Sequence, residues 1–142
     1  MSECIYINNI DSTPEWKKIL TTVIEYSDEF AIVFPNGEYD ADNPLLAGML
    51  DFKNLPNISV SPWPNMKDSS VYRAELNDTS RNLILNYTLN DTFDSLWNFS
   101  LYKGDLEVLN VADFSECFIY PDPEVIMLVT QNGIDLSRFD KW

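Results

Sequence analysis

In this 142-residue chain, the segment from Trp16 to Tyr26 reads WKKILTTVIEY and carries a strong helix signal. Its apolar residues recur at the spacing i, i+3, i+4, i+7 and i+8; they are Trp16, Ile19, Leu20, Val23 and Ile24. Residues at that spacing lie on one face of an α-helix, and Lys17 and Lys18 fall on the opposite face. The spacing therefore predicts an amphipathic helix that buries its apolar stripe against a second layer.

Two signals compete for the start of this helix. Ser12 and Glu15 have the spacing of a capping box, in which each side chain accepts a hydrogen bond from the other residue's backbone. Thr13 followed by Pro14 offers a second cap, with proline at the first helical position. Both starts remain open on the sequence.

The rest of the chain supplies strands for the second layer. Residues 30–34 are continuously apolar and are followed by Pro35-Asn36-Gly37, which predicts a central strand or one covered on both faces. Alternating and short apolar segments predict the remaining strands, at 3–8, 71–76, 83–89, 97–101, 106–111, 117–120 and 125–130. Lys103-Gly104-Asp105 is typical of a hairpin turn. One short helical turn is expected within 136–142.

Residues 35–70 form the least regular region and hold five of the eight prolines. A short strand or helix is predicted within 45–52. Long irregular segments are usually functional or disordered. Within this one, Ser61-Pro62-Trp63-Pro64 places an aromatic side chain on a stiff backbone. Trp63 is therefore either a contact residue or a cap over one end of the core.

These elements predict an α+β fold. We expect a single domain, 1–142, in which one N-terminal amphipathic helix packs on a mainly antiparallel, meander-like sheet. The length suits one core, and the hydrophobic content of 45% supplies enough material to fill it.

Two stretches of the chain contain acids and no base. Residues 19–52 and residues 104–137 each hold seven acids; these are Glu25, Asp28, Glu29, Glu38, Asp40, Asp42, Asp51, Asp105, Glu107, Asp113, Glu116, Asp122, Glu124 and Asp135. The other nine acids balance the nine Lys and Arg, so these fourteen equal the net charge of −14. Ordinary surfaces intersperse the two signs. If the stretches meet in the fold, they predict a binding surface for a cationic partner; if they lie apart, they serve solubility.

The charge also bounds the partners and the location. Nucleic-acid binders neutralise phosphates with Lys and Arg, so we expect no direct binding of DNA or RNA. An anionic membrane surface is equally disfavoured. The N-terminal segment MSECIYINNI lacks the charged and apolar regions of a signal peptide, and no apolar run approaches the roughly 18 residues of a membrane span. A cytoplasmic protein is expected.

The sequence carries no signature of an enzyme or of a cofactor. It contains no histidine, which removes Ser-His-Asp and Cys-His sites and the commonest metal ligand. Neither phosphate-binding glycine motif is present. Cys4 and Cys117 lie far apart and are predicted to be a buried pair of free thiols. We expect no catalysis, no cofactor and no bound metal.

Carboxylates leave two other interpretations open. A pair of acids could act as general acid and nucleophile in a carboxylate-dependent hydrolase. The segment Asp40-Ala41-Asp42-Asn43 alternates oxygen ligands for calcium, but it lacks the glycine and the closing glutamate of an EF-hand loop. A solvated acidic loop explains that segment equally well.

Small size, acidity, the α+β pattern and the lack of catalytic motifs resemble the bacterial toxin-immunity proteins of contact-dependent growth inhibition systems. The resemblance implies a protein that binds and neutralises a cognate toxin domain. Many such toxins are nucleases with basic substrate-binding clefts. An acidic surface with aromatic anchors would then block that cleft or a neighbouring surface.

The predicted contact residues are acids and aromatics of the irregular region and of the segment after strand 117–120; they are Glu38, Tyr39, Asp40, Asp42, Trp63, Tyr120, Asp122 and Glu124. The carboxylates would speed association and the aromatic side chains would slow dissociation. The runner-up is a DNA-mimic inhibitor of a DNA-binding enzyme. It requires carboxylates spaced regularly along an elongated surface, and the bases Lys67, Arg73 and Arg81 argue against that.

Overall fold

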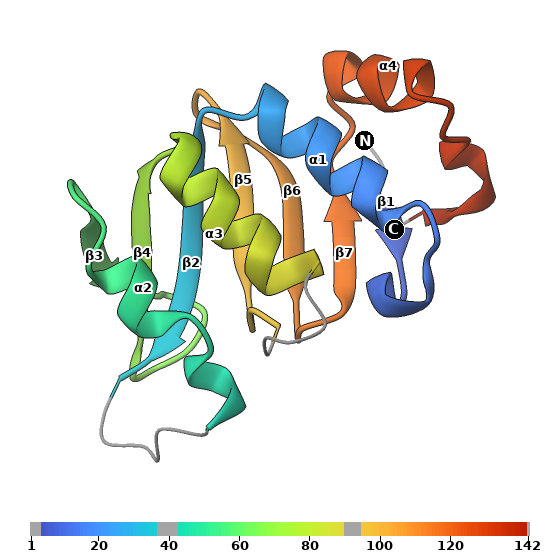
Figure 1. The fold of residues 1–142 in the computed structure, drawn as a ribbon. Helices are drawn as coiled ribbons and strands as arrows, with labels where there is room; N and C mark the ends of the chain where they lie inside the picture. Colours follow the sequence, from blue (N-terminus) through green and yellow to red (C-terminus); the bar gives the residue numbers. More distant parts are fainter. Residues whose placement is uncertain (1–3, 37–42, 90–94, 142) are drawn as a thin grey trace.

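The computed structural model describes residues 4–36, 43–89 and 95–141, which form an antiparallel sheet covered by helices (Figure 1). The strands are β1 (Ile5–Ile7), β2 (Glu29–Pro35), β3 (Ser59–Pro62), β4 (Ser69–Glu75), β5 (Phe99–Lys103), β6 (Leu106–Ala112), β7 (Glu116–Ile119) and β8 (Asp140–Lys141). The α-helices are α1 (Trp16–Tyr26), α2 (Met49–Lys53), α3 (Asp78–Leu89) and α4 (Pro123–Gln131). Short 3-10 helices are η1 (Ile10–Ser12), η2 (Pro44–Leu46) and η3 (Leu136–Arg138). The α+β class is confirmed.

The eight strands run in the order β3-β4-β2-β5-β6-β7-β1-β8, and every neighbouring pair is antiparallel. Only β5, β6 and β7 follow one another as a meander. β2 is inserted between β4 and β5, and β1 between β7 and β8. The expected meander is therefore local, because short turns join β5 to β6 to β7 whereas the apolar strand β2 needs a paired neighbour on each side.

Strand β2 lies inside the sheet, as its continuous apolar run predicts. Six of its seven residues are buried. Phe30, Ile32 and Phe34 point into the main core, where Phe52 of α2 packs against both phenylalanines. Ala31 and Val33 point to the opposite face of the sheet and line a hollow there. The strand is thus covered on the helix side and partly sheltered on the other side.

Helix α1 has the predicted bounds and the predicted buried stripe. Its start differs from both predicted caps, because Glu15 occupies the cap position and makes no side-chain capping bond. Ser12 instead ends η1, where its Oγ donates to the Asn9 carbonyl at 3.2 Å. The 3-10 turn carries the chain from β1 to α1 and leaves Ser12 too far back to cap the helix.

Residues 83–89 belong to helix α3, so the prediction of a strand there is wrong. Asn77 and Ser80 form reciprocal bonds at the helix start: Ser80 N donates to Asn77 Oδ1, and Asn77 N donates to Ser80 Oγ, both at 2.9 Å. Ser80 and Ile84, four residues apart, are the buried positions. The cap selects the helix, and its period overrides the alternation of apolar residues from Leu83 onward.

Residues 125–130 are likewise helical, within α4. Asp122 caps this helix, because its Oδ1 accepts hydrogen bonds from Glu124 N at 2.8 Å and Val125 N at 3.2 Å. Pro123 occupies the first turn, where its missing N–H does no harm. The region 45–52 contains η2 and the start of α2, and the tail forms η3 followed by β8. The prediction of one helix is therefore corrected to four α-helices in the described residues.

The cysteines form no disulfide, as expected. Cys117 of β7 is fully buried, but Cys4, just before β1, is only partly buried. The prediction of a buried pair is right for Cys117 alone.

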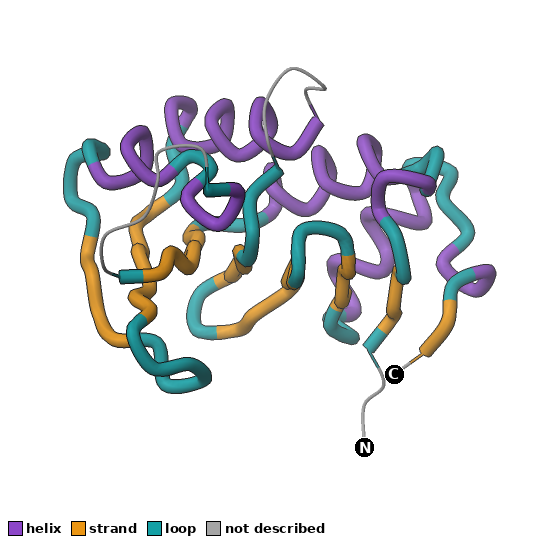
Figure 2. Tube along the Cα trace, turned by 90° about the horizontal axis from the view of Figure 1, so that it is seen from below, coloured by secondary structure: helices purple, strands orange, loops and turns teal. Residues whose placement is uncertain are grey.

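The helices of the described residues lie on one face of the sheet, and none of them covers the other face (Figure 2). Apolar side chains of β2, β5, β6, β7 and β1 point toward the helices and form one core with them. This two-layer arrangement places the polar half of each alternating strand on the open face. A binding site built from these polar side chains therefore lies on the open face.

Replacing Asn77 with alanine tests the cap of α3. The Asn77→Ala change removes the oxygen that accepts from Ser80 N, so we expect the free energy of unfolding to fall by about 1 kcal/mol. Urea unfolding followed by circular dichroism measures the change. Asn82→Ala, at an exposed position of the same helix, is the matched control and should leave stability equal or slightly higher. Equal losses in the two variants would contradict the cap.

Candidate functional site

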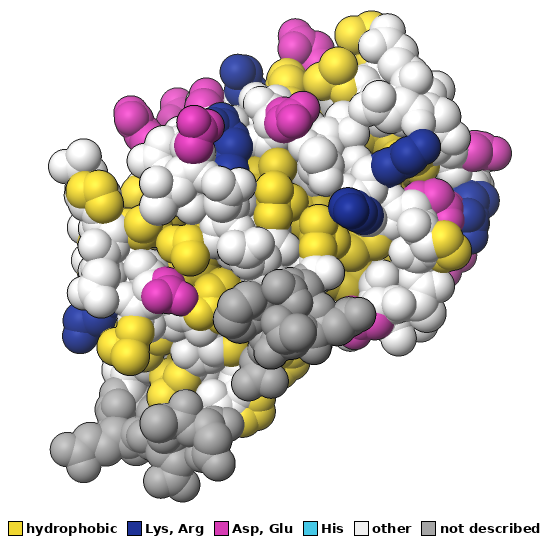
Figure 3. Space-filling model, in the orientation of Figure 1, with side chains coloured by type: hydrophobic (Ala, Val, Ile, Leu, Met, Phe, Trp, Pro, Cys, Tyr) yellow, Lys and Arg dark blue, Asp and Glu magenta, His cyan; other side chains and the backbone are white. Residues whose placement is uncertain are grey.

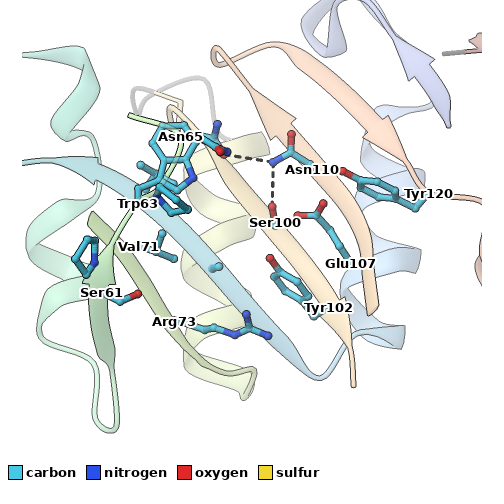
Figure 4. Close-up of a pocket in the computed structure, with 15 residues that line it drawn as sticks. Ser61, Trp63, Asn65, Val71, Arg73, Ser100, Tyr102, Glu107, Asn110 and Tyr120 are labelled. Carbon is cyan, nitrogen blue, oxygen red and sulfur yellow. Dashed lines mark hydrogen bonds between the residues drawn. The ribbon is translucent and has the colours of Figure 1, made fainter. Parts of the chain in front are cut away.

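The open face of the sheet carries a hollow of about 450 Å³ that extends from β3 to the end of β7. This volume lies within the range of about 300–1,000 Å³ that ligand pockets occupy. Its walls come from the β3–β4 loop, from the outward-facing residues of β2, β4, β5 and β6, and from Tyr120. Figure 4 shows Trp63 and Tyr120 at opposite ends of it. The hollow therefore brings together two residues that lie 57 positions apart in the sequence.

Trp63 forms the wall nearest β3. Its backbone N–H donates to the Ser69 carbonyl at 2.9 Å, which closes the loop between β3 and β4. Its ring meets the Trp97 ring edge to face, with centroids 6.0 Å apart. Pro62 and Pro64 on either side restrict the backbone. Trp63 thus packs over Trp97, which is nearly buried, and presents its remaining surface to the hollow.

Arg73 of β4 forms the lower wall and is held by two partners. Its guanidinium carbon lies 4.2 Å from the centre of the Tyr102 ring, a cation–π contact. Its Nε is paired with the Glu29 carboxylate, and the hydrogen bond to Glu29 raises the pKa of Arg73. The positive charge of Arg73 is therefore already compensated by Glu29.

A β-bulge turns Glu107 into the hollow. Leu101 lies opposite Leu109, but the next residue, Tyr102, lies opposite Glu107, so Val108 is an extra residue in β6. Strict alternation from Leu109 would turn Glu107 toward the helices. The extra residue instead sends Val108 into the core and turns Glu107 to the open face beside Tyr102.

The bulge also places Tyr120 beside Glu107. The backbone N–H of Tyr120 donates to the Val108 carbonyl at 3.0 Å, which satisfies the carbonyl of the extra residue. Burial raises the pKa of Tyr120 above its ordinary value, and a hydrogen bond with Glu107 raises it further. Burial, and then the charge of Glu107, also raise the pKa of Tyr102. The Glu107 carboxylate is thus flanked by two neutral phenols (Figure 4).

An amide cluster forms the floor of the hollow. The Asn110 side chain donates to Ser100 Oγ at 2.9 Å, to the Phe99 carbonyl at 3.2 Å and to Asn98 Oδ1 at 3.3 Å. These bonds link β5 and β6 across the open face and fix the orientation of the amide. The floor is therefore polar, and these hydrogen bonds connect its side chains to one another.

The two base-free stretches meet at the end of the sheet where β2 begins and β5 turns into β6. Asp28 of the first stretch accepts hydrogen bonds from Gly104 N in that turn, at 3.0 and 3.1 Å for its two oxygens. Burial raises the pKa of Tyr26, at the end of α1, and the charges of Asp122, Glu124 and Asp28 raise it further, so these three carboxylates lie near one phenol. The ammonium of Lys103 lies over the same ring, 5.1 Å from its centre.

We call this group the acidic end; its members are Asp28, Glu29, Asp105, Asp122 and Glu124. Asp105 joins it through its charge interaction with Arg73, the partner of Glu29. The hollow borders the acidic end, because Arg73, Tyr102 and Glu107 line the hollow at that side. On the helix-covered face, acidic and basic side chains also lie side by side (Figure 3).

The predicted contact residues fall into three groups. Trp63 and Tyr120 line the same hollow. Asp122 and Glu124 lie in the acidic end, with Asp122 occupied as the cap of α4 and Glu124 inside that helix rather than in an open turn. The others, Glu38, Tyr39, Asp40 and Asp42, lie outside the described residues, and so does most of the acidic segment 40–43.

Sequence reasoning missed Glu107, Tyr102 and Arg73 as residues of the site. One signal for Glu107 was present: in Glu107-Val108-Leu109-Asn110 two apolar residues adjoin between two polar ones, which breaks the alternation of the strand. Such a break is what a bulge produces. No comparable signal marks Arg73 and Tyr102, since their contact depends on the pairing of β2 with both β4 and β5.

The described residues contain no group of three or more Cys, Asp or Glu side chains placed to hold a metal ion. None of the helices in the described part of the chain is long and apolar enough to cross a membrane. Comparisons with protein-family models, with curated proteins and with solved structures found no match. The geometry of the open face is therefore the basis for the functional argument.

Replacing Glu107 with glutamine should lower the pKa of Tyr120. The carboxylate disfavours a phenolate beside it, so its removal brings Tyr120 closer to the ordinary value of 10.0, while burial keeps the pKa above that value. Alkaline titration of tyrosinate absorbance measures the shift, and Tyr120→Phe identifies the signal. Glu25→Gln, on the exposed side of α1, should leave it unchanged. An identical titration in Glu107→Gln would contradict the contact.

The same shift has a consequence for stability. Because the folded-state pKa of Tyr120 is raised, its contribution to folding is complete below pH 10.0 and is progressively lost as the pH rises further. In Tyr120→Phe this part of the alkaline destabilisation should be absent, as measured by urea unfolding at a series of pH values. A decline as steep as that of the unchanged protein would contradict the assignment.

Proposed function

We propose that this chain is an immunity protein, which binds and neutralises a cognate bacterial toxin that carries a basic surface. Binding uses the acidic end together with the open face of the sheet. The partner is a toxin domain, with a nuclease that has a basic cleft as the favoured kind. The location that follows from this function is the cytoplasm, where such a toxin acts on its target.

One observation carries the proposal: acids from two sequence stretches without a base converge at one end of the sheet. Asp28 from the first stretch bonds to the turn that opens the second, and Asp122 and Glu124 lie around the same tyrosine as Asp28. Convergence is what a binding surface requires, whereas a device for solubility has no need of it. A net charge of −14 adds a long-range attraction for a cationic protein.

The hollow supplies what charge alone lacks. Rim charges mainly raise association rates, while aromatic side chains in partly desolvated pockets slow dissociation. Trp63 and Tyr120 stand at the two ends of the hollow and are held by Trp97 and Glu107 respectively. Side chains already fixed in this way lose little conformational entropy on binding. The acidic end thus suits the first encounter with the partner, and the hollow suits the stable complex that follows.

Two features favour this function over the alternatives. A DNA mimic needs a regular row of carboxylates, but Arg73 lies between Glu29 and the hollow and interrupts any such row. A carboxylate-dependent hydrolase needs two convergent acids, and the described lining of the hollow includes one, Glu107. Both features support binding of a protein.

Co-expression tests the proposal directly. The probe is the C-terminal domain of a toxin encoded next to this protein's gene. We expect the protein to restore growth of cells that express the toxin domain and to elute with it as one complex in gel filtration. Failure of both, with both proteins soluble, would overturn the proposal.

Charge reversal at the acidic end tests the electrostatic part. Asp105→Lys, in the exposed β5–β6 turn, should slow association with the toxin domain several-fold at low salt, and much less at high salt, because screening removes long-range attraction. Stopped-flow fluorescence measures the rate. Glu25→Lys makes the same charge change on the helix-covered side and should slow association less. Equal effects of the two changes at every salt concentration would exclude the acidic end from the interface.

A further inference from the structure

We infer that the hollow on the open face is a receptor for one cationic side chain, Arg or Lys, of the protein partner. The cationic head would lie against the Glu107 carboxylate, and its stem would run along the hollow between Tyr120 and Trp63. The partner's identity rests on the proposed function, but the chemistry of the hollow does not. The chemistry of the hollow follows from its charged residues, its lining and the local backbone.

The charge balance of the hollow calls for a cation. The charged residues of its described lining are Arg73 and Glu107. Arg73 is paired with Glu29 and stacks on Tyr102, so its charge is already balanced. The described neighbours that interact with Glu107 include the phenols of Tyr102 and Tyr120 and the thiol of Cys4, and the raised pKa values of all three groups keep them neutral to higher pH than usual. An anionic or carboxylate ligand would meet Glu107 at close range and be repelled.

The backbone is built to present this carboxylate. Val108 enters the core as the extra residue of the bulge, and that insertion is what sends Glu107 to the open face. A bulge leaves one residue without its place in the ladder, and here Tyr120 N restores the bond to the Val108 carbonyl at 3.0 Å. The same bond fixes the position of Tyr120, whose phenol lies beside Glu107. One backbone feature therefore assembles both the carboxylate and an aromatic wall.

The lining suits the stem of a long cationic side chain. Ala31, Val33 and Val71 give an apolar strip, and the amides of Asn98 and Asn110 give a polar floor. Long cationic side chains bury an apolar stem and keep a polar head bonded. Aromatic rings at the ends of the hollow add attraction for a cation, as Tyr102 already does for Arg73. A purely apolar ligand would cover the Glu107 carboxylate without balancing its charge.

Charge complementarity also selects the occupant. A second copy of this chain carries −14 as well and would be repelled from the acidic end beside the hollow. A basic partner would be attracted to that end first and would then insert a side chain into the adjoining hollow. The committed occupant is therefore an Arg or Lys of a cationic protein.

The first experiment needs no partner and no variant. The probe is the peptide acetyl-Gly-Arg-Gly-amide, and the control is the same peptide with citrulline, a neutral isostere of arginine. NMR of the ¹⁵N-labelled protein follows the Trp63 indole N–H and the Asn110 side-chain amide. We expect the arginine peptide to shift both signals in a saturable way and the citrulline peptide to leave them unchanged. Equal shifts with both peptides would overturn the inference.

Two variants then test whether the charge of Glu107 is the one that binds the arginine peptide. Glu107→Gln keeps the size of the side chain and removes its charge, and should weaken binding of the arginine peptide about tenfold or more, because a charge-assisted bond is lost. Glu25→Gln removes the same charge from the exposed side of α1 and should weaken binding less than about twofold. Equal weakening in the two variants would show diffuse attraction to the acidic protein and would overturn the inference.

The toxin domain separates this inference from the proposed function. If the unchanged protein binds the toxin domain and Glu107→Gln binds it about tenfold more weakly than Glu25→Gln does, the inference is supported. If both variants bind like the unchanged protein, the inference fails and the proposed function stands. If the toxin domain does not bind at all while the arginine peptide occupies the hollow, the proposed function fails and the cation site stands.

Discussion

The burial of the apolar strand β2 determines which strands and helices can lie beside it. Six of its seven residues are buried, so it needs a paired strand at each edge and side-chain cover on the helix side. β4 and β5 meet the first need, and α1, α2 and α3 meet the second through the common core. A strand of this kind cannot occupy an edge, because an edge would expose its backbone and its side chains together. The position of β2 between β4 and β5 follows from this requirement.

The helices in the described part of the chain pack on one side, so the two faces of the sheet differ in chemistry. The helix-covered face is an apolar core, and the open face collects the polar half of each strand. A polar face tolerates a bulge, an ion pair and a network of amides that a core would exclude. The same one-sided packing that stabilises the protein therefore supplies the place where a partner can be recognised.

The pairing of the strands brings parts of the two base-free stretches together on the surface. The first base-free stretch includes the end of α1 and all of β2, and the second opens with the turn between β5 and β6. Because β2 pairs with β5 in the antiparallel sense, the start of β2 lies beside that turn, and Asp28 bonds to Gly104. Asp51 in α2 and Asp135 before η3 lie in other parts of the fold, so the pairing concentrates only part of the charge.

Sequence patterns predict α1, the inner strand β2, the β5–β6 hairpin and the α+β class, because each rests on a local period or a turn signal. They do not predict α3 and α4, where bonds from Asn77 and Asp122 to the first helical N–H groups outweigh short apolar runs that read equally well as strands. Only the tertiary structure decided that Trp63 and Tyr120 share a hollow with Arg73, and that Glu107 faces it. The physical reason is that strand order and the bulge at Val108 depend on pairing between distant segments, which no local period records.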